Sequence, residues 1–405
     1  MSKKTSVSFA FTEEAKLKRS IRRHFTNLGF RKDNEGALVL PDNSKETVRK
    51  LHRRQRAEKL ASNKQFMEKR YPKVEKYFAN GNEIIPENIS LRLKLVKTGT
   101  IEADIFRAAS LTWSVPVSNG YGRRLRYLVW DQAHDRLVGI FALGDPVFNL
   151  AVRDNLIGWS LEDRKRRLVN ILDAYVLGAV PPYNMLLGGK AVACMIRTRE
   201  VYNDFRRTYG RTTGIISQEK KGARLLAVTT TSSMGRSSIY NRLKLGSQQY
   251  FQPIGYTLGF GHFHITDAIF SKMRDYLRVS AHPYVDEHNF GDGPNWRMRT
   301  IRVALRALGI NQSVMKHGIK RQVFICLMSE KSVSFLKSGR GSLGLKSLKS
   351  ADEVSNLVVK RWIIPRAKRR GEYKFWRRES IKPLMKTGIM DTLPKQIQSP
   401  NILPL

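Results

Sequence analysis

Residues 171–190, ILDAYVLGAVPPYNMLLGGK, decide how the fold is interpreted. The apolar run at 171–180 predicts a strand that ends near Val180. Two consecutive prolines follow, and because proline lacks an N–H for the sheet ladder, they are expected to end the strand. A helix is then expected to begin within residues 185–190. The stretch therefore predicts a strand, an irregular turn and a helix, as in α/β proteins.

The residues on both sides of this stretch continue the pattern. Upstream, apolar runs at 125–130 and 137–143 flank a polar turn and predict a β-hairpin. Downstream, the apolar residues of 187–205 recur on one helical face. Further strands are expected at 223–233 and 250–265, with a short helix between them. This order of elements predicts a mixed α/β domain.

The chain is expected to divide into four consecutive regions. The first is helical, because Thr12 fits the start of a helix, Gly29 fits its end, and a second helical segment covers 45–81. The four regions are a basic helical N-terminal region at 1–91, an α/β core at 92–270, a C-terminal extension of the core at 271–344, and a basic aromatic-containing tail at 345–405.

The charge balance points to a polyanionic partner. The 405 residues include 73 Lys and Arg against 34 Asp and Glu, which gives a formal net charge of +39. Such an excess strains a compact protein by self-repulsion, and nucleic acid is the commonest polyanion that relieves it. The sequence contains no apolar run of about 18 residues and no apolar signal-peptide segment. It therefore predicts a cytoplasmic protein without membrane attachment.

Basic residues with a possible role in nucleic-acid binding gather in three places. The helical segment at 45–81 could track a phosphate backbone, or its charges could form a solvated face balanced by glutamates. The hydroxyl-rich run at 229–238 could bind an anion or cap a helix. In the tail, aromatic residues alternate with arginines and lysines. This composition suits stacking on single-stranded nucleic acid, and the alternative is a basic tail without such a role. The candidate residues are Arg53, Arg54, Arg56, Arg236, Arg361, Trp362, Arg369, Arg370 and Trp376.

The Gly-Gly-Lys at 188–190 is not a nucleoside-triphosphate loop. That motif requires a first glycine where Asn184 stands and a Ser or Thr where Ala191 stands. The main-chain amides at the helix start could still receive a pyrophosphate, since they have no partner within the helix. The candidate cofactor-binding residues are Leu187, Gly188, Gly189 and Lys190, and the alternative is a tight helix start.

Histidines and aspartates supply two possible metal sites. His262 and His264 are one residue apart, so on a strand their side chains would share a face, and His282, Asp286 and His288 follow. Such a group could hold a divalent metal for phosphodiester hydrolysis, but the spacing matches no standard metal site, and histidines that are hydrogen-bonded or stacked on bases explain it better. A second possible metal-binding cluster comprises Asp145, Asp154 and Asp173. The alternative is that these aspartates cap helices and form turns.

Six stretches together resemble a bacterial family typified by the first protein of the Druantia anti-phage defence system. In order, they are LTWSVPVSNGYGRRLRYLVWD, VGIFALGDPVFNL, RDNLIGW, DAYVLGAVPPYNMLLGGK, TTTSSMGRSSIYNRL and IGYTLGFGHFHI. The resemblance runs across most of the chain. It implies a component of a multi-gene antiviral system that acts with other subunits, including a large helicase-like protein, but it supplies no catalytic residues.

The central part also resembles the GNAT acetyltransferase superfamily and its Mom group, which modifies phage adenine bases. This resemblance rests on 176–191 and on SSIYNRLKLG at 237–246. It implies a GNAT-like mixed sheet, a coenzyme at 187–190 and Tyr240 as general acid, although the family's Arg or Gln at the loop start is absent and the tyrosine-to-glycine spacing is longer.

Two classes of function therefore stay open. We favour a nucleic-acid-binding subunit of a defence system, and the alternative is an enzyme, either an acyltransferase or a metal-dependent nuclease. The sequence leaves both the catalytic activity and the cofactor undetermined.

Overall fold

The computed structural model describes residues 12–32, 38–40, 44–117, 122–213, 218, 222–262, 264–282 and 296–387. The chain divides into two compact units, each built from segments far apart in the sequence. Unit 1 comprises Met1–Gln55 and Leu258–Lys320, and unit 2 comprises Arg56–Thr257 and Arg321–Leu405. The division into four consecutive regions that the sequence suggested stays a prediction, because the two units do not test it.

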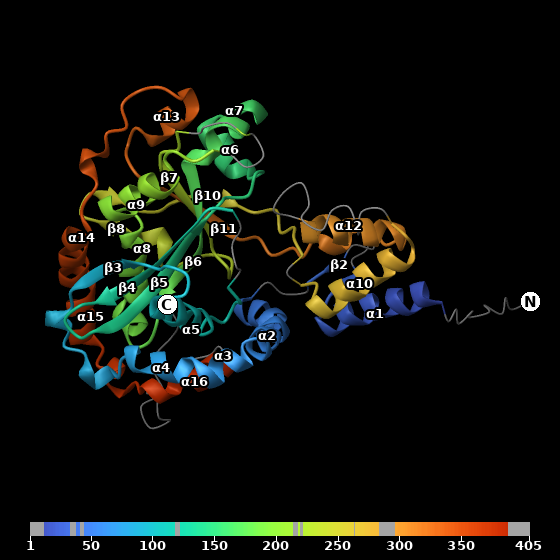
Figure 1. The fold of residues 1–405 in the computed structure, drawn as a ribbon, viewed down its shortest axis with the longest axis horizontal. Helices are drawn as coiled ribbons and strands as arrows, with labels where there is room; N and C mark the ends of the chain where they lie inside the picture. The colour runs from blue at the N-terminus through green and yellow to red at the C-terminus, as the bar shows by residue number, and fades with distance from the viewer. Residues whose placement is uncertain are drawn as a thin grey trace, which may run out of the picture. The chain divides into compact units, whose positions relative to one another are not determined.

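Unit 1 is mainly helical. The expected first helix is confirmed: the Thr12 side chain caps it, and Gly29 follows it with a φ of 87° that favours glycine. This helix packs against α10, which in turn packs against α12 (Figure 1). The elements are α1 Glu13–Asn27, β1 Arg31–Lys32, β2 Leu38–Val39, α10 Asp267–Val279 and α12 Trp296–Ala307, and the boundary to unit 2 falls within α2 Lys45–Ala61.

Unit 2 contains a seven-stranded mixed sheet in the order β10-β11-β7-β6-β5-β4-β3. The expected hairpin is confirmed as the antiparallel pair β4 and β5, and the expected α/β fold with a mixed sheet is confirmed as well. The strands are β3 Leu91–Leu95, β4 Arg124–Asp131, β5 Arg136–Gly144, β6 Ile171–Ala179, β7 Ala227–Thr231, β10 Gln252–Tyr256 and β11 Gln322–Leu327.

The pairing of β6 with β7 is parallel, whereas the other described neighbours in this sheet are antiparallel. It joins Ile171–Asp173 to Ala227–Thr229, after which β6 continues alone on that side. On the other side of β6, the pairing with β5 changes register at Tyr175, so β6 has a β-bulge at this residue. The two parallel strands therefore pair only where they begin.

Helices cover both faces of the sheet and one of its ends. One face packs against α8 Gly188–Met195, α9 Arg199–Tyr209 and α14 Ala351–Val358. The other face packs against α3 Lys64–Lys69, α4 Tyr71–Val74, α5 Ile101–Ser110 and α16 Ile381–Thr387. At the end where β6 and β7 begin lie α6 Ala151–Ile157, α7 Leu161–Arg167 and α13 Ser332–Ser338 (Figure 1). Unit 2 also contains α15 Ile364–Arg369.

Several predicted elements differ from the structure. The helical face predicted over 187–205 is divided between α8 and α9, because the chain leaves the helix before Thr198. The helix predicted between the fourth and fifth strands is a single turn at Tyr240–Arg242, followed by β8 Lys244–Leu245 and β9 Gln248–Gln249. The strand predicted over 250–265 covers only Gln252–Tyr256, since the chain enters unit 1 at Leu258.

Candidate nucleic-acid interface

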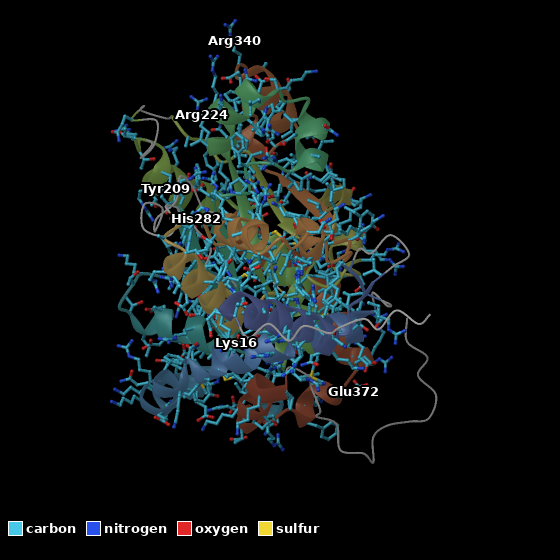
Figure 2. The ribbon with its side chains drawn as sticks, turned by 90° about the vertical axis from the view of Figure 1, so that its right-hand side faces the viewer. Lys16, Tyr209, Arg224, His282, Arg340 and Glu372 are labelled. Atoms are coloured by element: carbon cyan, nitrogen blue, oxygen red, sulfur yellow. The ribbon has the colours of Figure 1, made fainter. Side chains whose placement is uncertain are left out.

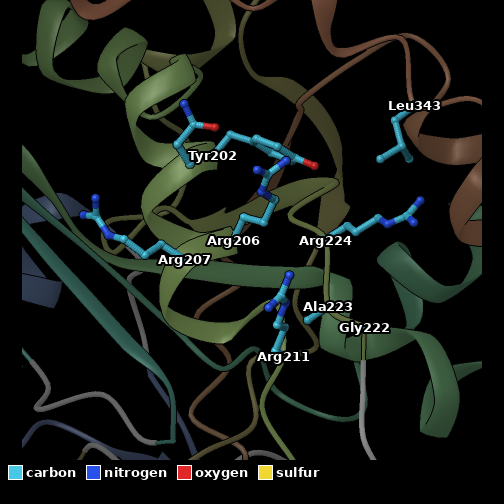
Figure 3. A pocket seen from close by; sticks show the side chains of 10 residues that line it. Tyr202, Arg206, Arg207, Arg211, Gly222, Ala223, Arg224 and Leu343 are labelled. Carbon is cyan, nitrogen blue, oxygen red and sulfur yellow. The ribbon is translucent and has the colours of Figure 1, made fainter.

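A basic cavity lies at the end of the sheet where β6 and β7 begin. It has a volume of about 1090 Å³, and Figure 3 shows it between α9 and the segment that carries Leu343. Arg206, Arg211 and Arg224 surround the hollow, whereas the side chain of Arg207 points to the far side of the helix. The lining residues are Tyr202, Asn203, Arg206, Arg207, Gly210, Arg211, Gly222, Ala223, Arg224 and Leu343.

A second cavity of about 450 Å³ continues from the first, because both are lined by Gly222 and Arg224. Its other lining residues are Arg167, Asn170, Phe335, Gly339, Arg340 and Gly341. We call the two cavities together the arginine groove. Figure 2 shows Arg224 and Arg340 toward one end of unit 2 and Glu372 at the opposite end.

The walls of the groove follow from local sequence. On α9, Val201 and Phe205 are fully buried and hold the helix on the core, which leaves the exposed side chain of Arg206 on the groove side. The segment leading into β7 is fixed by Asn170, whose side-chain oxygen accepts from the Arg224 main-chain N–H at 2.9 Å. The groove is therefore built on elements anchored to the sheet.

Arg167 fixes the opposite wall. Its guanidinium pairs with Asp163 at 2.9 Å and donates to the carbonyl oxygens of Leu336, Lys337 and Ser338 at the end of α13. A Cβ at Gly339, which has a φ of 75°, would lie 3.2 Å from the Arg167 Nε atom. Glycine therefore allows the chain to turn closely over this guanidinium.

Among the described residues, the charge of the arginine groove is largely uncompensated. The described part of its lining contains six arginines and no Asp or Glu. Arg207 pairs with Asp204 at 2.6 Å, and Arg167 is paired as described. Within the described residues, no carboxylate forms an ion pair with the remaining four, which are Arg206, Arg211, Arg224 and Arg340. Like charges gathered without counter-charges repel one another, so an anionic ligand would relieve this cluster.

Aromatic side chains lie beside these cations. The Arg224 guanidinium is 5.7 Å from the centre of the Phe335 ring. Burial raises the pKa of Tyr202, and the positive charges of Arg206 and Arg224 oppose that rise. Tyr202 therefore lies within the field of both guanidiniums. The groove combines phosphate-binding cations with ring surfaces, a composition typical of nucleic-acid sites.

Sequence analysis did not identify the arginine groove. The signal available was Arg206 and Arg207 on a helix with a buried opposite face, followed by Arg211 two residues beyond the end of that helix. Only the fold brings them to Arg224 and Arg340.

Some residues predicted to bind nucleic acid instead have structural partners. Arg56 is 6% exposed and donates to the carbonyl oxygens of Leu384 at 2.5 Å and Met385 at 2.6 Å, while burial lowers its pKa to about 10. Trp362 and Trp376 are 8% and 2% exposed and pack in the two main cores, so neither ring is open to a base. Of the aromatic residues in the tail, Tyr373 is also buried, whereas Phe375 is exposed.

The other predicted arginines are exposed or half-buried. Arg370 pairs with Glu372 at 3.3 Å. The exposed residues are Arg53 and Arg54 in unit 1, and Arg236, Arg361 and Arg369 in unit 2.

The predicted cofactor residues at the start of α8 lie against the Tyr240 turn. A Cβ at Gly188 would lie 2.5 Å from the Tyr183 carbonyl oxygen, so this position requires glycine. A Cβ at Gly189 would lie 3.4 Å from Ile239, one residue before the turn. Leu187, just before the helix, has a left-handed φ of 61°. The structure therefore brings together two segments that sequence analysis selected separately.

Side chains around this helix start are basic and aromatic. The Lys190 ammonium lies 5.3 Å from the Trp362 ring centre, and burial, followed by the charges of Arg242 and Arg361, lowers its pKa. The Tyr240 ring lies 5.2 Å from the ring of Phe251 and from that of Phe324. Burial raises the pKa of Tyr240, so its hydroxyl is protonated at neutral pH.

One of the two predicted metal ligands, His264, has other partners. His264 donates from Nε2 to the Val314 carbonyl oxygen at 2.8 Å, and its own carbonyl oxygen lies 2.7 Å from the His24 Nε2. Burial lowers the pKa of His262 and of His264 to about 4. In the described ranges, no group of three His, Cys, Asp or Glu is placed to hold a metal ion. Asp286 and His288 lie outside the described residues.

The three aspartates are also engaged separately. Asp145 pairs with Arg123 at 2.7 Å, and Asp154 pairs with Arg153 and Arg164, each at 2.6 Å. The remaining residue, Asp173, accepts from the Thr229 hydroxyl at 2.7 Å, and burial raises its pKa to about 6.

Comparisons with known proteins give one consistent result. Residues 42–338 match the family model described as Druantia protein DruA. The Druantia protein DruA of Escherichia coli (strain UMEA 4076-1) is 56% identical over 368 residues, which cover 91% of each chain. No solved structure matches the chain. In the part of the chain that the structure describes, no helix is both long enough and apolar enough to cross a membrane.

Proposed function

The chain belongs to the Druantia protein DruA family, and from this premise we propose that it is a nucleic-acid-binding component of a Druantia anti-phage defence system. The observation that carries the proposal is the arginine groove, whose lining, where the structure describes it, has six arginines and no carboxylate. The net charge of +39 supports it, since the whole protein attracts polyanions.

The chemistry of the groove suits a phosphate backbone. A guanidinium offers a planar fork of donors that matches phosphate oxygens, and it stays charged at any physiological pH. Each phosphate that it neutralises releases condensed counterions, which makes binding favourable and dependent on salt. The exposed residues Arg53, Arg54, Arg236, Arg361 and Arg369 are candidates for further phosphate contacts.

Within the defence system, the chain would act in the cytoplasm beside other subunits, including a helicase-like protein. Its part would be to recognise or position phage nucleic acid for them. This part of the proposal rests on the family and on the charge of the chain.

The direct test is a titration of fluorescein-labelled oligonucleotides with the full chain, followed by fluorescence anisotropy. The dissociation constant should rise steeply as salt is increased from about 50 to 200 mM. An absence of binding at the lowest salt would refute the proposal.

A second candidate function, acyl transfer, is supported by a separate observation. The short parallel pairing of β6 and β7, the bulge at Tyr175 and the meeting of α8 with the Tyr240 turn resemble the layout expected of a GNAT-like fold. The positive charges of Lys190, Arg242 and Arg361 would suit the phosphates of a coenzyme A, whereas Ile239 lies against the helix start where those phosphates would bind.

Thermal denaturation with coenzyme A tests this second candidate. A ligand at 100 times its dissociation constant stabilises the folded state by about 2.7 kcal/mol, so millimolar coenzyme should raise the melting temperature measurably. An unchanged melting temperature would count against acyl transfer and leave the nucleic-acid proposal unaffected.

A further inference from the structure

We propose that the arginine groove binds single-stranded rather than duplex nucleic acid, with phosphates held by the exposed guanidiniums and bases placed on the half-buried apolar side chains of its lining. This inference rests on the proposed function, because it specifies the kind of nucleic acid that the same groove binds. Three features of the groove support it: its shape, the apolar side chains of its lining and the position of one aromatic ring.

The groove is concave. One wall is α9, the other is the segment from Phe335 to Leu343, and the floor is the chain entering β7 at 222–224 (Figure 3). Proteins that read duplex DNA usually insert a projecting helix or ribbon into a major groove about 12 Å wide. Among the described residues that line it, this hollow between two walls offers no such projection, whereas it suits a thin, flexible strand.

The lining of the groove combines apolar and charged side chains. Tyr202 and Ala223 are 8% and 2% exposed, so they offer little surface to a base. The half-buried side chains of Phe335 and Leu343 provide the accessible apolar surface, and the exposed Arg206 and Arg224 line the same groove. A duplex keeps its bases paired inside and would leave this apolar surface uncovered, while a single strand can turn its bases onto it.

Phe335 gives the groove a ring beside a cation. Its side chain is half-buried, and the Arg224 guanidinium lies 5.7 Å from its centre, which is within the range of a cation–π contact. A base that stacks on the ring would place its phosphate near the same guanidinium. The ring and Arg224 thus form one place for a whole nucleotide, and every base has a face that can stack there.

The test compares a labelled oligothymidine of 12 nucleotides with a duplex of 12 base pairs, both titrated with the full chain at equal salt. We expect the single strand to bind at least about tenfold more tightly, because only it can use the stacking surface. Equal or tighter binding of the duplex would overturn this inference and leave the proposed function in place. Failure to bind either would overturn both.

A variant separates stacking from charge. Phe335→Leu keeps an apolar side chain but removes the ring, so affinity for the single strand should fall about 5- to 100-fold, the effect of losing one stacked base. The dependence on salt should not change, because no phosphate contact is lost.

Phe375→Leu is the matched control, since Phe375 is 53% exposed and lies outside the groove lining. It should bind as the wild type does. If Phe335→Leu, folded as shown by circular dichroism, bound the single strand as tightly as wild type, the inference would be wrong.

Discussion

Removing three uncompensated charges from the arginine groove should weaken nucleic-acid binding by a predictable amount. The change is Arg206→Gln, Arg211→Gln and Arg224→Gln in one variant, and all three side chains are exposed. For single strands, the logarithm of the binding constant falls by about 0.7 per phosphate contact for each tenfold rise in salt. At 1 M salt the counterion contribution to binding vanishes on this scale, so at 0.1 M each contact contributes about fivefold to the affinity. The loss of three contacts should therefore lower the affinity at 0.1 M salt roughly 100-fold.

The assay is fluorescence anisotropy of a labelled oligothymidine at several salt concentrations. The slope of log K against log salt should become shallower by about 2 in the variant, because three contacts are lost. Substitutions at exposed positions usually change stability by less than about 0.5 kcal/mol, so the melting temperature should stay near that of the wild type.

The control variant removes the same charge elsewhere in unit 2. Lys69, Lys73 and Lys374 are exposed and lie outside the groove lining, so replacing them with glutamine should lower affinity only a few-fold. Equal losses in both variants would refute the reasoning, because binding would then depend on total charge and not on the groove.

Three further predictions concern residues that the fold uses elsewhere. Gly188→Ala should destabilise the protein in urea unfolding by about 1–3 kcal/mol, because the new Cβ would lie 2.5 Å from the Tyr183 carbonyl oxygen. The control is Gly371→Ala, which has no atom within 4 Å of the new Cβ and should leave the urea midpoint nearly unchanged. Arg56→Ala should cost about 2–3 kcal/mol, since it leaves two carbonyl oxygens near α16 without their buried donor, and a melting temperature equal to that of wild type would contradict this. Burial raises the pKa of Asp173 from 3.8 to about 6, so this side chain binds a proton more readily in the folded protein, and its contribution to stability falls as pH rises from about 4 to above 6. In urea unfolding at pH 7, Asp173→Asn should therefore be up to ~3 kcal/mol more stable than wild type. A stability advantage that did not shrink toward pH 4 would contradict the raised pKa.

The central strands could be predicted because their apolar runs are long and bounded by clear turns. The hairpin of β4 and β5 and the strand β6 are examples. By contrast, β11 was not predicted: it pairs with β7 and β10 only after the chain returns from unit 1, and no local pattern records that pairing.

The burial of the aromatic tail residues also escaped the sequence analysis. In the sequence, Trp362 and Trp376 lie among arginines and lysines. A basic surface and a helix with one buried side both show this pattern, and the two tryptophans are buried. Burial depends on the partner surface, and here that surface comes from residues more than a hundred positions away, including Leu91 and Phe66.

The candidate site was the least accessible part. Arg56 and Arg206 look alike in the sequence, yet one is buried on main-chain carbonyls and the other lines an open groove. The groove gathers residues from 167 to 343, so its existence depends on tertiary packing. Composition predicted the kind of partner, and only the fold indicates where such a partner would bind.

Mapping of photo-crosslinks tests the central claim most directly. The full chain would be irradiated with an oligonucleotide that contains 5-iododeoxyuridine, and the linked peptides identified by mass spectrometry. The arginine groove predicts crosslinks at Phe335, whose half-buried ring lies 5.7 Å from the Arg224 guanidinium. Crosslinks confined to other segments, such as α3 and α4, would contradict the account.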